Sequence, residues 1–449
     1  MAEKVMPHNI EAEKSVLCSM FLTKYALQKA TETLRPESFF LDSNGKIFEV
    51  LCSLTSQNIP IDMTTVTAEL DRQKVLKQVG GVEYLTELID FVPTAANIDE
   101  YIKIVEEKAV LRRLIDTATD IVSMGYNSTS SLTNILDDSE KRMLEVVKSR
   151  KSGTFKPIVD VLKSSREKLE ALAQINKEVT GIPSFYKDID SVTSGFQKNE
   201  LIIIAARPAM GKTAFALNLA TNIAINGGKT VALFNMEMSA EQLAFRMIAN
   251  LGQVNQGRLR NGRLDHNDWK GVNEAISKLE GAKMYIDDTA SMTVNEIMAK
   301  CRRLAASKDG LDIVIIDYLG LIQGSKTYAG NRQMEVSEIS RALKALAMEL
   351  EIPVIACAQL SRNVESSDRK DKRPIMSDLR DSGSIEQDAD IVAFLFRQDY
   401  YDRTESKENP VSESEFIIGK NRSGSTRTVP LIFKRDTSTF LDMDRPVEE

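Results

Sequence analysis

The sequence is poor in the side chains that most often build metal and acid–base sites. Its 449 residues include only two histidines, His8 and His266, and four cysteines. So few imidazoles nearly exclude a site built on histidine, and the cysteines show no C-x-x-C spacing, so no zinc site is indicated. Scattered thiols without a pairing pattern are typical of a reduced cytosolic protein, and we expect a cytoplasmic location.

Long apolar runs and an excess of basic residues are also lacking. No stretch approaches the roughly 20 residues of a membrane-spanning helix, and the start Met1-Ala2-Glu3-Lys4 has no apolar signal region, so we expect no membrane association. The formal net charge is −7, and neither the part up to Lys156 nor the remainder is basic. Any contact with nucleic acid therefore depends on local loops or on a channel built by several subunits.

The apolar pattern divides the chain into three parts. From Glu11 to about Lys148 apolar residues recur at helical spacing, which predicts a helical N-terminal domain over residues 1–150 that ends in a hairpin of two long helices. Residues 151–180 contain a polar linker and one amphipathic helix, roughly Ile158 to Lys177. The apolar stripe of this helix packs either on its own second domain or on a neighbouring subunit, and the pattern alone favours neither.

In residues 181–449 the apolar residues recur with a different spacing. Short β-branched runs alternate with helices, which predicts an α/β fold whose mostly parallel sheet is covered by helices on both faces. The predicted parallel strands are Leu201–Ala205, Val231–Phe234, Met284–Ile286, Ile313–Ile316, Val354–Ala358 and Ile391–Phe396. Two further strands, Glu415–Ile418 and Val429–Phe433, are joined by a polar turn and are predicted to complete the sheet as a hairpin.

The most informative segment joins the first predicted strand to a helix. A strand, a tight loop and a helix in this order form a P-loop, in which backbone N–H groups and the helix dipole bind a polyphosphate such as that of ATP. Lys212 is expected to reach the outer phosphates and Thr213 to hold Mg²⁺. Ala206 stands where the first glycine usually lies, which requires a backbone angle that alanine can adopt. The predicted nucleotide-binding residues are Ala206, Arg207, Pro208, Ala209, Met210, Gly211, Lys212, Thr213 and Ala214.

Three polar residues follow neighbouring strands of the predicted sheet, where ligands of α/β proteins gather. Asp317 is expected to be the carboxylate on the Mg²⁺ side, with a helix cap or turn as the alternative. Glu237 is expected to act as the general base that activates water, with a glutamate favoured by a helix dipole as the alternative. Gln359 is expected to sense the γ-phosphate and to pass its presence to the following loop, unless it is a plain turn residue.

Three other segments are candidates for functional contacts. Lys420 and Arg422 lie at the predicted hairpin tip, where cations are usually only solvated. If the protein is a ring, they could reach a neighbour's ATP. The loops from Arg362 to Arg373 and from Leu379 to Ser384 could follow a phosphate backbone, although each alone is more typical of a solvated loop. Neither loop is aromatic, so base stacking is not predicted.

Taken in order, these motifs resemble those of the DnaB family of bacterial replicative DNA helicases. The resemblance extends over nearly the whole chain, and one departure is Asp381, where the family more often has glutamate. The matching segments are Pro7–Leu17, Ala205–Thr213, Asn235–Met238, Ile316–Leu319, Gln359–Arg362, Asp378–Asp390 and Lys420–Arg422.

The resemblance implies an ATP-dependent DNA helicase with a RecA-like motor domain. It implies a homohexameric ring around single-stranded DNA that hydrolyses ATP with Mg²⁺ at subunit interfaces and moves 5′→3′. Carried over by position, Glu237 activates water, Gln359 couples ATP to DNA, and Lys420 and Arg422 act on the adjacent subunit's nucleotide. The DNA-contacting loop would comprise Arg380, Asp381 and Gly383.

The resemblance also implies partners: primase, a helicase loader and the clamp-loader complex. It favours docking of the helix after the linker on the next subunit. A RecA-like DNA-dependent ATPase acting in recombination is the alternative, and a kinase or a scaffold with the same core is a third possibility. The helical N-terminal domain favours the helicase, because a collar suits a closed ring.

Overall fold

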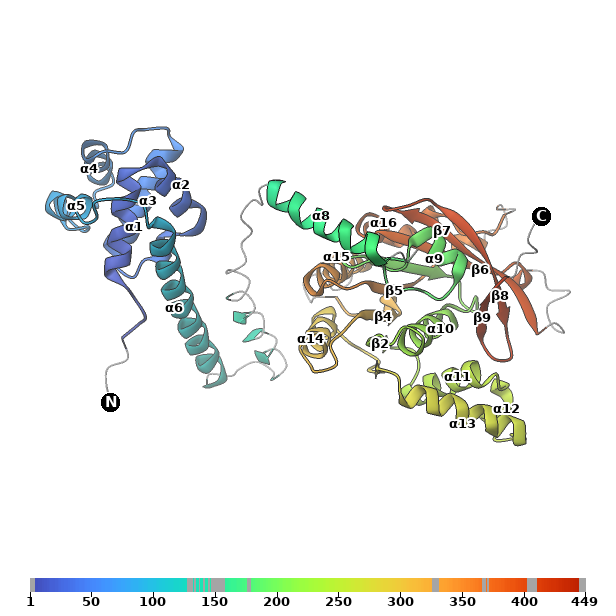
Figure 1. Cartoon of the computed structure of the whole chain (residues 1–449). Coiled ribbons are helices and arrows are strands. Elements are labelled where there is room, and N and C mark those ends of the chain that lie inside the picture. Colours follow the sequence, from blue (N-terminus) through green and yellow to red (C-terminus); the bar gives the residue numbers. More distant parts are fainter. Residues whose placement is uncertain are drawn as a thin grey trace. The chain divides into compact units, whose positions relative to one another are not determined.

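The computed structural model describes residues 5–126, isolated positions between 132 and 146, and residues 158–175, 179–324, 331–365, 369, 371–401 and 410–443. The chain forms two compact units, Met1–Ser165 and Arg166–Glu449 (Figure 1). The boundary between them falls inside the helix α8, Ile158–Ile175.

The N-terminal unit is helical. Its buried core is formed by apolar residues at helical spacing, including Val16 and Leu17 of α1 and Ile47 and Leu51 of α3. The helical elements are α1 (Ile10–Leu22), α2 (Lys24–Thr33), η1 (Pro36–Ser38), α3 (Asp42–Ser56), α4 (Met63–Arg72), α5 (Gly81–Ile89) and α6 (Ile98–Tyr126). The second helix of the predicted hairpin falls mostly outside the described residues, but Arg142 lies 3.2 Å from Asp120 of α6.

The apolar side chains of α8 that the structure describes are exposed to solvent in the single chain. An amphipathic helix normally buries such a stripe, so the exposure is consistent with a partner surface for α8. The exposed apolar residues of α8 are Ile158, Val159, Val161, Leu162 and Leu169.

The C-terminal unit is built on one nine-stranded sheet of order β3-β2-β4-β5-β1-β6-β7-β8-β9. The first six strands in this order pair in parallel and the last three are antiparallel. The strands are β1 (Leu201–Ala206), β2 (Val231–Asn235), β3 (Met284–Asp287), β4 (Ile313–Asp317), β5 (Val354–Gln359), β6 (Ile391–Phe396), β7 (Val411–Asn421), β8 (Arg427–Lys434) and β9 (Thr439–Asp442). The mostly parallel α/β sheet predicted from the sequence is therefore confirmed.

The antiparallel end differs in detail from the sequence prediction. The strand β7 runs beyond the predicted range in both directions. Residues 411–414 alternate exposed and buried positions, and residues 419–421 have no large apolar side chain, so neither end carries a continuous apolar signal. Lys420 consequently lies within a strand and not in the hairpin turn. The strand β9 was not predicted at all.

Helices cover both faces of this sheet. Alternate residues of β1 point to opposite faces: Ile202 and Ile204 join the core beneath α10, and Leu201 and Ile203 join the core beneath α15. The helices are α9 (Lys187–Thr193), α10 (Lys212–Ile225), α11 (Ala240–Gly252), α12 (Gln256–Asn261), α13 (His266–Glu280), α14 (Val294–Ala305), α15 (Arg332–Leu350) and α16 (Gly383–Asp388). The described 3-10 segments include η2 (Leu319–Leu321), η4 (Arg362–Glu365), η5 (Met376–Ser382) and η6 (Gln398–Tyr400).

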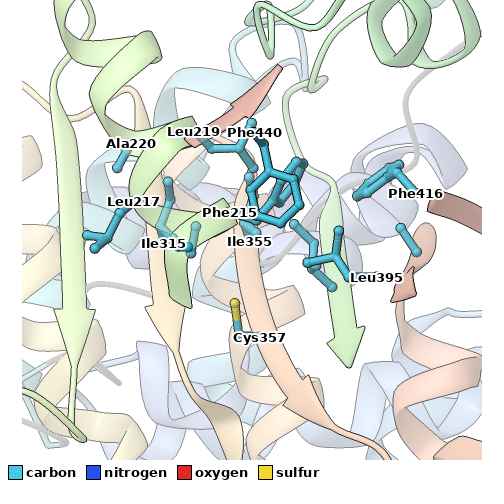
Figure 2. Packing of buried hydrophobic residues seen from close by; sticks show 14 of the residues in the cluster. Phe215, Leu217, Leu219, Ala220, Ile315, Ile355, Cys357, Leu395, Phe416 and Phe440 are labelled. Carbon is cyan, nitrogen blue, oxygen red and sulfur yellow. The ribbon is translucent and has the colours of Figure 1, made fainter. Parts of the chain in front are cut away.

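Phe215 anchors α10 to the sheet. Its ring is fully buried, and its centroid lies 5.2 Å from those of both Phe416 of β7 and Phe440 of β9 (Figure 2). Aromatic contacts of this kind add to the burial of apolar area, and close packing permits little displacement. The first turn of α10 is therefore held firmly at the end of β1.

Candidate nucleotide-binding site

The P-loop connects the central strand β1 to α10. The N-terminal cap of α10 is Gly211, whose φ of 98° is readily adopted by glycine. A Cβ there would lie 2.9 Å from Cζ of Phe440, so glycine is required for space as well. Ala206 is the last residue of β1 and is paired with Gln359. Alanine readily adopts this extended backbone. The requirement that Ala206 have a backbone angle open to alanine is therefore met.

Lys212 and Asp317 form a mostly buried ion pair in which Nζ lies 3.2 Å from Oδ1. The ammonium also lies 4.0 Å from the ring centroid of Tyr318, an arrangement that holds the lysine head near the phosphate loop. Asp317 ends β4 and caps no helix, because the cap of η2 is Tyr318. The turn or cap alternative for Asp317 therefore finds no support in the local structure.

The carboxylate of Asp317 suits a metal ion. The residue is fully buried, and its Oδ2 accepts a 3.4 Å hydrogen bond from Asn235, whereas Oδ1 has no hydrogen-bond donor among the described residues. The 3.2 Å contact with Lys212 is thus an ion pair without hydrogen-bond geometry. A buried acceptor is rarely left unsatisfied. Together with the hydroxyl of Thr213 in the first turn of α10, this oxygen has the hard-donor chemistry that Mg²⁺ prefers.

A cavity of about 490 Å³ lies over the P-loop. It brings together P-loop residues and side chains at the carboxyl ends of β2 and β5, as the sequence predicted for Glu237 and Gln359. The lining residues are Ala206, Arg207, Pro208, Ala209, Gly211, Lys212, Thr213, Ala214, Glu237, Met238, Arg246, Gln359, Phe433 and Ser438. Met210 does not line the cavity and is buried in the core beneath α10.

Glu237 precedes α11 and does not belong to its first turn, since the cap of that helix is Ser239. The helix-dipole alternative for Glu237 is therefore not supported. Its position is set by Asn235, whose Oδ1 accepts hydrogen bonds from the backbone N–H of Glu237 at 3.0 Å and of Met238 at 2.7 Å. The carboxylate is exposed at the cavity, where it is accessible to water.

Apart from Met238, which is next to Glu237 in the chain, three cavity residues were missed by the sequence analysis: Arg246 of α11, Phe433 of β8 and Ser438 in the turn before β9. Phe433 and Ser438 are more than 200 residues from the P-loop, and Arg246 is one of two charged residues on the amphipathic helix α11. No local motif marks any of the three. The tertiary packing of the β8–β9 hairpin and α11 against α10 alone brings them to the cavity.

Arg207 lines the cavity, but its guanidinium is bound to protein groups. Its Nε and Nη2 donate to Oε1 and Oε2 of Glu365 at 3.0 and 2.8 Å, and Nη1 donates to the carbonyl of Leu360 at 3.0 Å. The hydrogen bond with Glu365 raises the pKa of Arg207 above its ordinary value. Both acceptors belong to the segment that follows β5.

Lys420 and Arg422 lie far from this cavity. Lys420 donates to the carbonyls of Glu386 and Ala389 at 2.5 and 2.7 Å, and burial together with the nearby Arg422 lowers its pKa. Arg422 pairs with Asp390 at 3.2 Å. These contacts lie at the start of β6, whereas the P-loop follows the end of the adjacent parallel strand β1. The two cations are therefore at the opposite edge of the sheet from the nucleotide cavity of their own chain.

The predicted DNA-contacting residues lie between β5 and β6. The backbone of Arg380 and Asp381 belongs to η5, and Gly383 is the first residue of α16. The segment is anchored just before them by Asp378, which is 5% exposed and accepts two hydrogen bonds from Arg369 at 2.9 and 2.7 Å.

Comparison with known proteins identifies the family of this chain. Residues 181–442 match the family model described as DnaB-like helicase C terminal domain, and residues 5–107 match the DnaB-like helicase N terminal domain. The chain belongs to the DnaB-like helicase family. Among the residues that the structure describes, no helix is both long and apolar enough to span a bilayer.

Full-length relatives agree with this assignment. The replicative DNA helicase DnaB of Geobacillus stearothermophilus is 49% identical over 448 residues, which cover 100% of this chain and 97% of the relative. The replicative DNA helicase DnaC of Bacillus subtilis is 47% identical over 447 residues, with the same coverage. A solved structure titled as a DnaB-like replicative helicase and its interactions with primase matches with a TM-score of 0.77 and 33% identity, covering 97% of this chain and 100% of that one.

A second solved structure, of an ATPase domain, matches with a TM-score of 0.59 and 38% identity, covering 65% of this chain and 100% of that one. The predicted family, fold and function, an ATP-dependent replicative DNA helicase with a RecA-like α/β domain, are thereby confirmed. The relatives favour replication over the recombination alternative.

Proposed function

We propose that this DnaB-like helicase acts as a homohexameric ring around single-stranded DNA and moves 5′→3′ as it hydrolyses ATP at the interfaces between subunits. The observation that carries the proposal is the position of Lys420 and Arg422. Lys420 pairs with Val392 near the start of β6, whereas the P-loop strand β1 ends beside Leu395 near the end of β6. The two positions are therefore about 10 Å apart along the strand direction. Cations at that end of the strands can contact the nucleotide of a neighbouring subunit but not the nucleotide of their own chain.

ATP and Mg²⁺ are the proposed nucleotide and metal. Lys212 and the P-loop backbone would bind the phosphates, and Thr213 and Asp317 would hold the ion, which neutralises phosphate charge when bound. The support is the cavity itself, the buried Oδ1 of Asp317 without a hydrogen-bond donor among the described residues, and the exposed carboxylate of Glu237 at the rim. In this scheme Glu237 takes the proton of the attacking water.

Changing Glu237 to glutamine is expected to retain ATP binding and to lower hydrolysis by about 10²- to 10⁴-fold, because the amide cannot accept the proton of water. Binding of a fluorescent ATP analogue and release of phosphate measure the two steps separately. Glu241→Gln is the matched control, since Glu241 is an exposed carboxylate in the first turn of α11 outside the cavity. Normal turnover in the Glu237 variant would assign the base to another residue.

The proposed DNA contact is the segment of Arg380, Asp381 and Gly383, with Gln359 linking the cavity to it. The fold supports this arrangement, because Gln359 ends β5 beside the P-loop strand, and η4 and then η5 follow β5 in the chain. A phosphate backbone can be followed by backbone N–H groups and a few arginines, which agrees with the low overall basicity of the chain.

The domains proposed are residues 1–150 as a helical collar, 151–180 as the linker with α8, and 181–449 as the motor. The exposed apolar side chains of α8 support docking on the adjacent subunit. Primase is a proposed partner, because a solved relative is described with its primase interactions. A helicase loader and the clamp-loader complex are proposed from the family alone, and the cytoplasm, which contains the bacterial chromosome, is the proposed location.

Strand displacement on forked DNA tests the proposed function directly. We expect ATP-dependent unwinding of a fork with a 5′ single-stranded tail and no unwinding of a fork whose only tail is 3′. The same protein with ATP analogue and DNA should form six-membered rings in electron micrographs. Unwinding from the 3′ tail, or open filaments along the DNA, would contradict the proposal and favour the recombinase alternative.

A further inference from the structure

The P-loop is joined by a side chain to the loop that follows β5. Arg207 is 8% exposed, and all three nitrogens of its guanidinium donate to that loop, two of them to Glu365 and one to Leu360. A bidentate pair between a guanidinium and a carboxylate is strong and fixes direction as well as distance. A shift of the P-loop backbone at Arg207 therefore moves Glu365 with it.

The same loop is bound at its other side to η5. The backbone N–H of Ser361 donates to the carbonyl of Asp378 at 3.2 Å. The carboxylate of Asp378 receives Arg369 and, at 2.8 Å, the backbone N–H of Ile375. Asp378 is two residues before Arg380, in the segment proposed to contact DNA. Through Leu360 and Ser361, contacts thus run without a break from Arg207 of the phosphate loop to Asp378, beside the segment proposed to contact DNA.

Arg207 differs in this respect from the other P-loop residues. Lys212 pairs with Asp317 at the end of β4, a residue of the proposed metal site, whereas Arg207 pairs with Glu365 in the loop after β5. Gln359 connects the cavity to the loop through the chain itself, and Arg207 provides a second connection across space. A third connection is the 3.1 Å hydrogen bond from the backbone N–H of Leu360 to the carbonyl of Ala206. The position of the loop is therefore sensitive to the phosphate loop at Leu360 and at Glu365.

We propose that the Arg207–Glu365 pair couples nucleotide binding to DNA binding within one subunit, with both side chains acting as positioning residues. The inference rests on the proposed function, because it assigns a route between the proposed ATP and DNA sites. Coupling between two ligands is reciprocal: if DNA changes the affinity for ATP by some factor, ATP changes the affinity for DNA by the same factor. Loss of the pair should lower that factor in both directions.

The test measures the coupling factor in the full-length protein. The dissociation constant of a non-hydrolysable ATP analogue is determined with and without saturating oligo-deoxythymidine, and that of the oligonucleotide with and without the analogue. For Glu365→Gln, which keeps the size of the side chain but removes its charge, we expect the ratio in each direction to fall at least about fivefold toward one. Turnover with DNA should fall more than turnover without it.

A matched control distinguishes coupling from general stability. Arg302 and Glu349 form a second bidentate pair in the same unit, between α14 and α15, at 2.8 and 3.0 Å. Glu349→Gln should leave the coupling factor at its wild-type value. Retention of the wild-type factor in Glu365→Gln, or an equal loss in both variants together with an equal fall in melting temperature, would overturn the inference. Wild-type protein that binds no ATP analogue would instead overturn the proposed function.

Discussion

ATP turnover is expected to fall by about 10²- to 10³-fold when Lys212 is replaced by arginine, because the P-loop ammonium stabilises charge on the transferred phosphoryl group in the transition state. Arginine keeps a positive charge beside Asp317, which is fully buried, but its planar fork does not reproduce the compact ammonium over Tyr318. Phosphate release under saturating ATP measures the effect.

Lys212→Ala should abolish turnover as well, but it also leaves the carboxylate of Asp317 buried without its cation, and breaking such a pair is destabilising. The arginine variant therefore separates catalysis from folding. Lys229→Ala is the matched control: Lys229 lies 3.2 Å from Asp312, the same separation as in the Lys212 pair, but at the opposite ends of β2 and β4. Full activity in the arginine and alanine variants of Lys212 would remove the nucleotide site from this position.

Mixing two inactive variants is expected to restore ATPase activity. Arg422→Ala should be inactive alone, because it cannot complete a neighbour's site, and Glu237→Gln should be inactive alone, because it lacks the base. In a mixed ring, roughly one interface in four then combines an intact Glu237 from one subunit with an intact Arg422 from the next. Turnover of the mixture should exceed that of either variant, measured after the subunits have exchanged.

The control for this experiment mixes Lys212→Arg with Glu237→Gln. Both residues line the cavity of one chain, so no interface in that mixture contains an intact pair and no activity should return. Recovery in the control, or no recovery with Arg422→Ala, would argue that the site is complete within one chain. Arg422 also forms an ion pair with Asp390, so its removal can change stability. The melting temperature of Arg422→Ala therefore has to be compared with that of the wild type.

The strands and the P-loop could be predicted because their signals are local. A strand buried on both faces reads as an unbroken apolar run, as in β1 and β6, and the strand-loop-helix order of the phosphate site is continuous in sequence. Asp317 and Glu237 were placed correctly at the carboxyl ends of parallel strands, because that edge of the sheet is where such residues converge. Their proposed roles await the experiments above.

Other features could not be predicted, because the contacts that define them join distant parts of the chain. Arg246, Phe433 and Ser438 reach the cavity only through packing of α11 and of the β8–β9 hairpin. The strand β9 is only four residues long, which is too short for the spacing of its apolar residues to identify it. The partner of Arg207 is Glu365, 158 residues away in sequence, so no local pattern pairs the two side chains.

Sequence by itself determined which chemistry this protein can carry, since a P-loop, its carboxylates and their order along the chain are written in short segments whose backbone conformation is dictated locally. Only the tertiary structure decided where the charges act. The register of β6 with β1 and β7 sets Lys420 and Arg422 at the far edge of the sheet, and packing of the loop after β5 against the P-loop directs Arg207 to Glu365. The physical reason is that strand register and side-chain pairing depend on the burial of surfaces far apart in sequence, which no local pattern encodes.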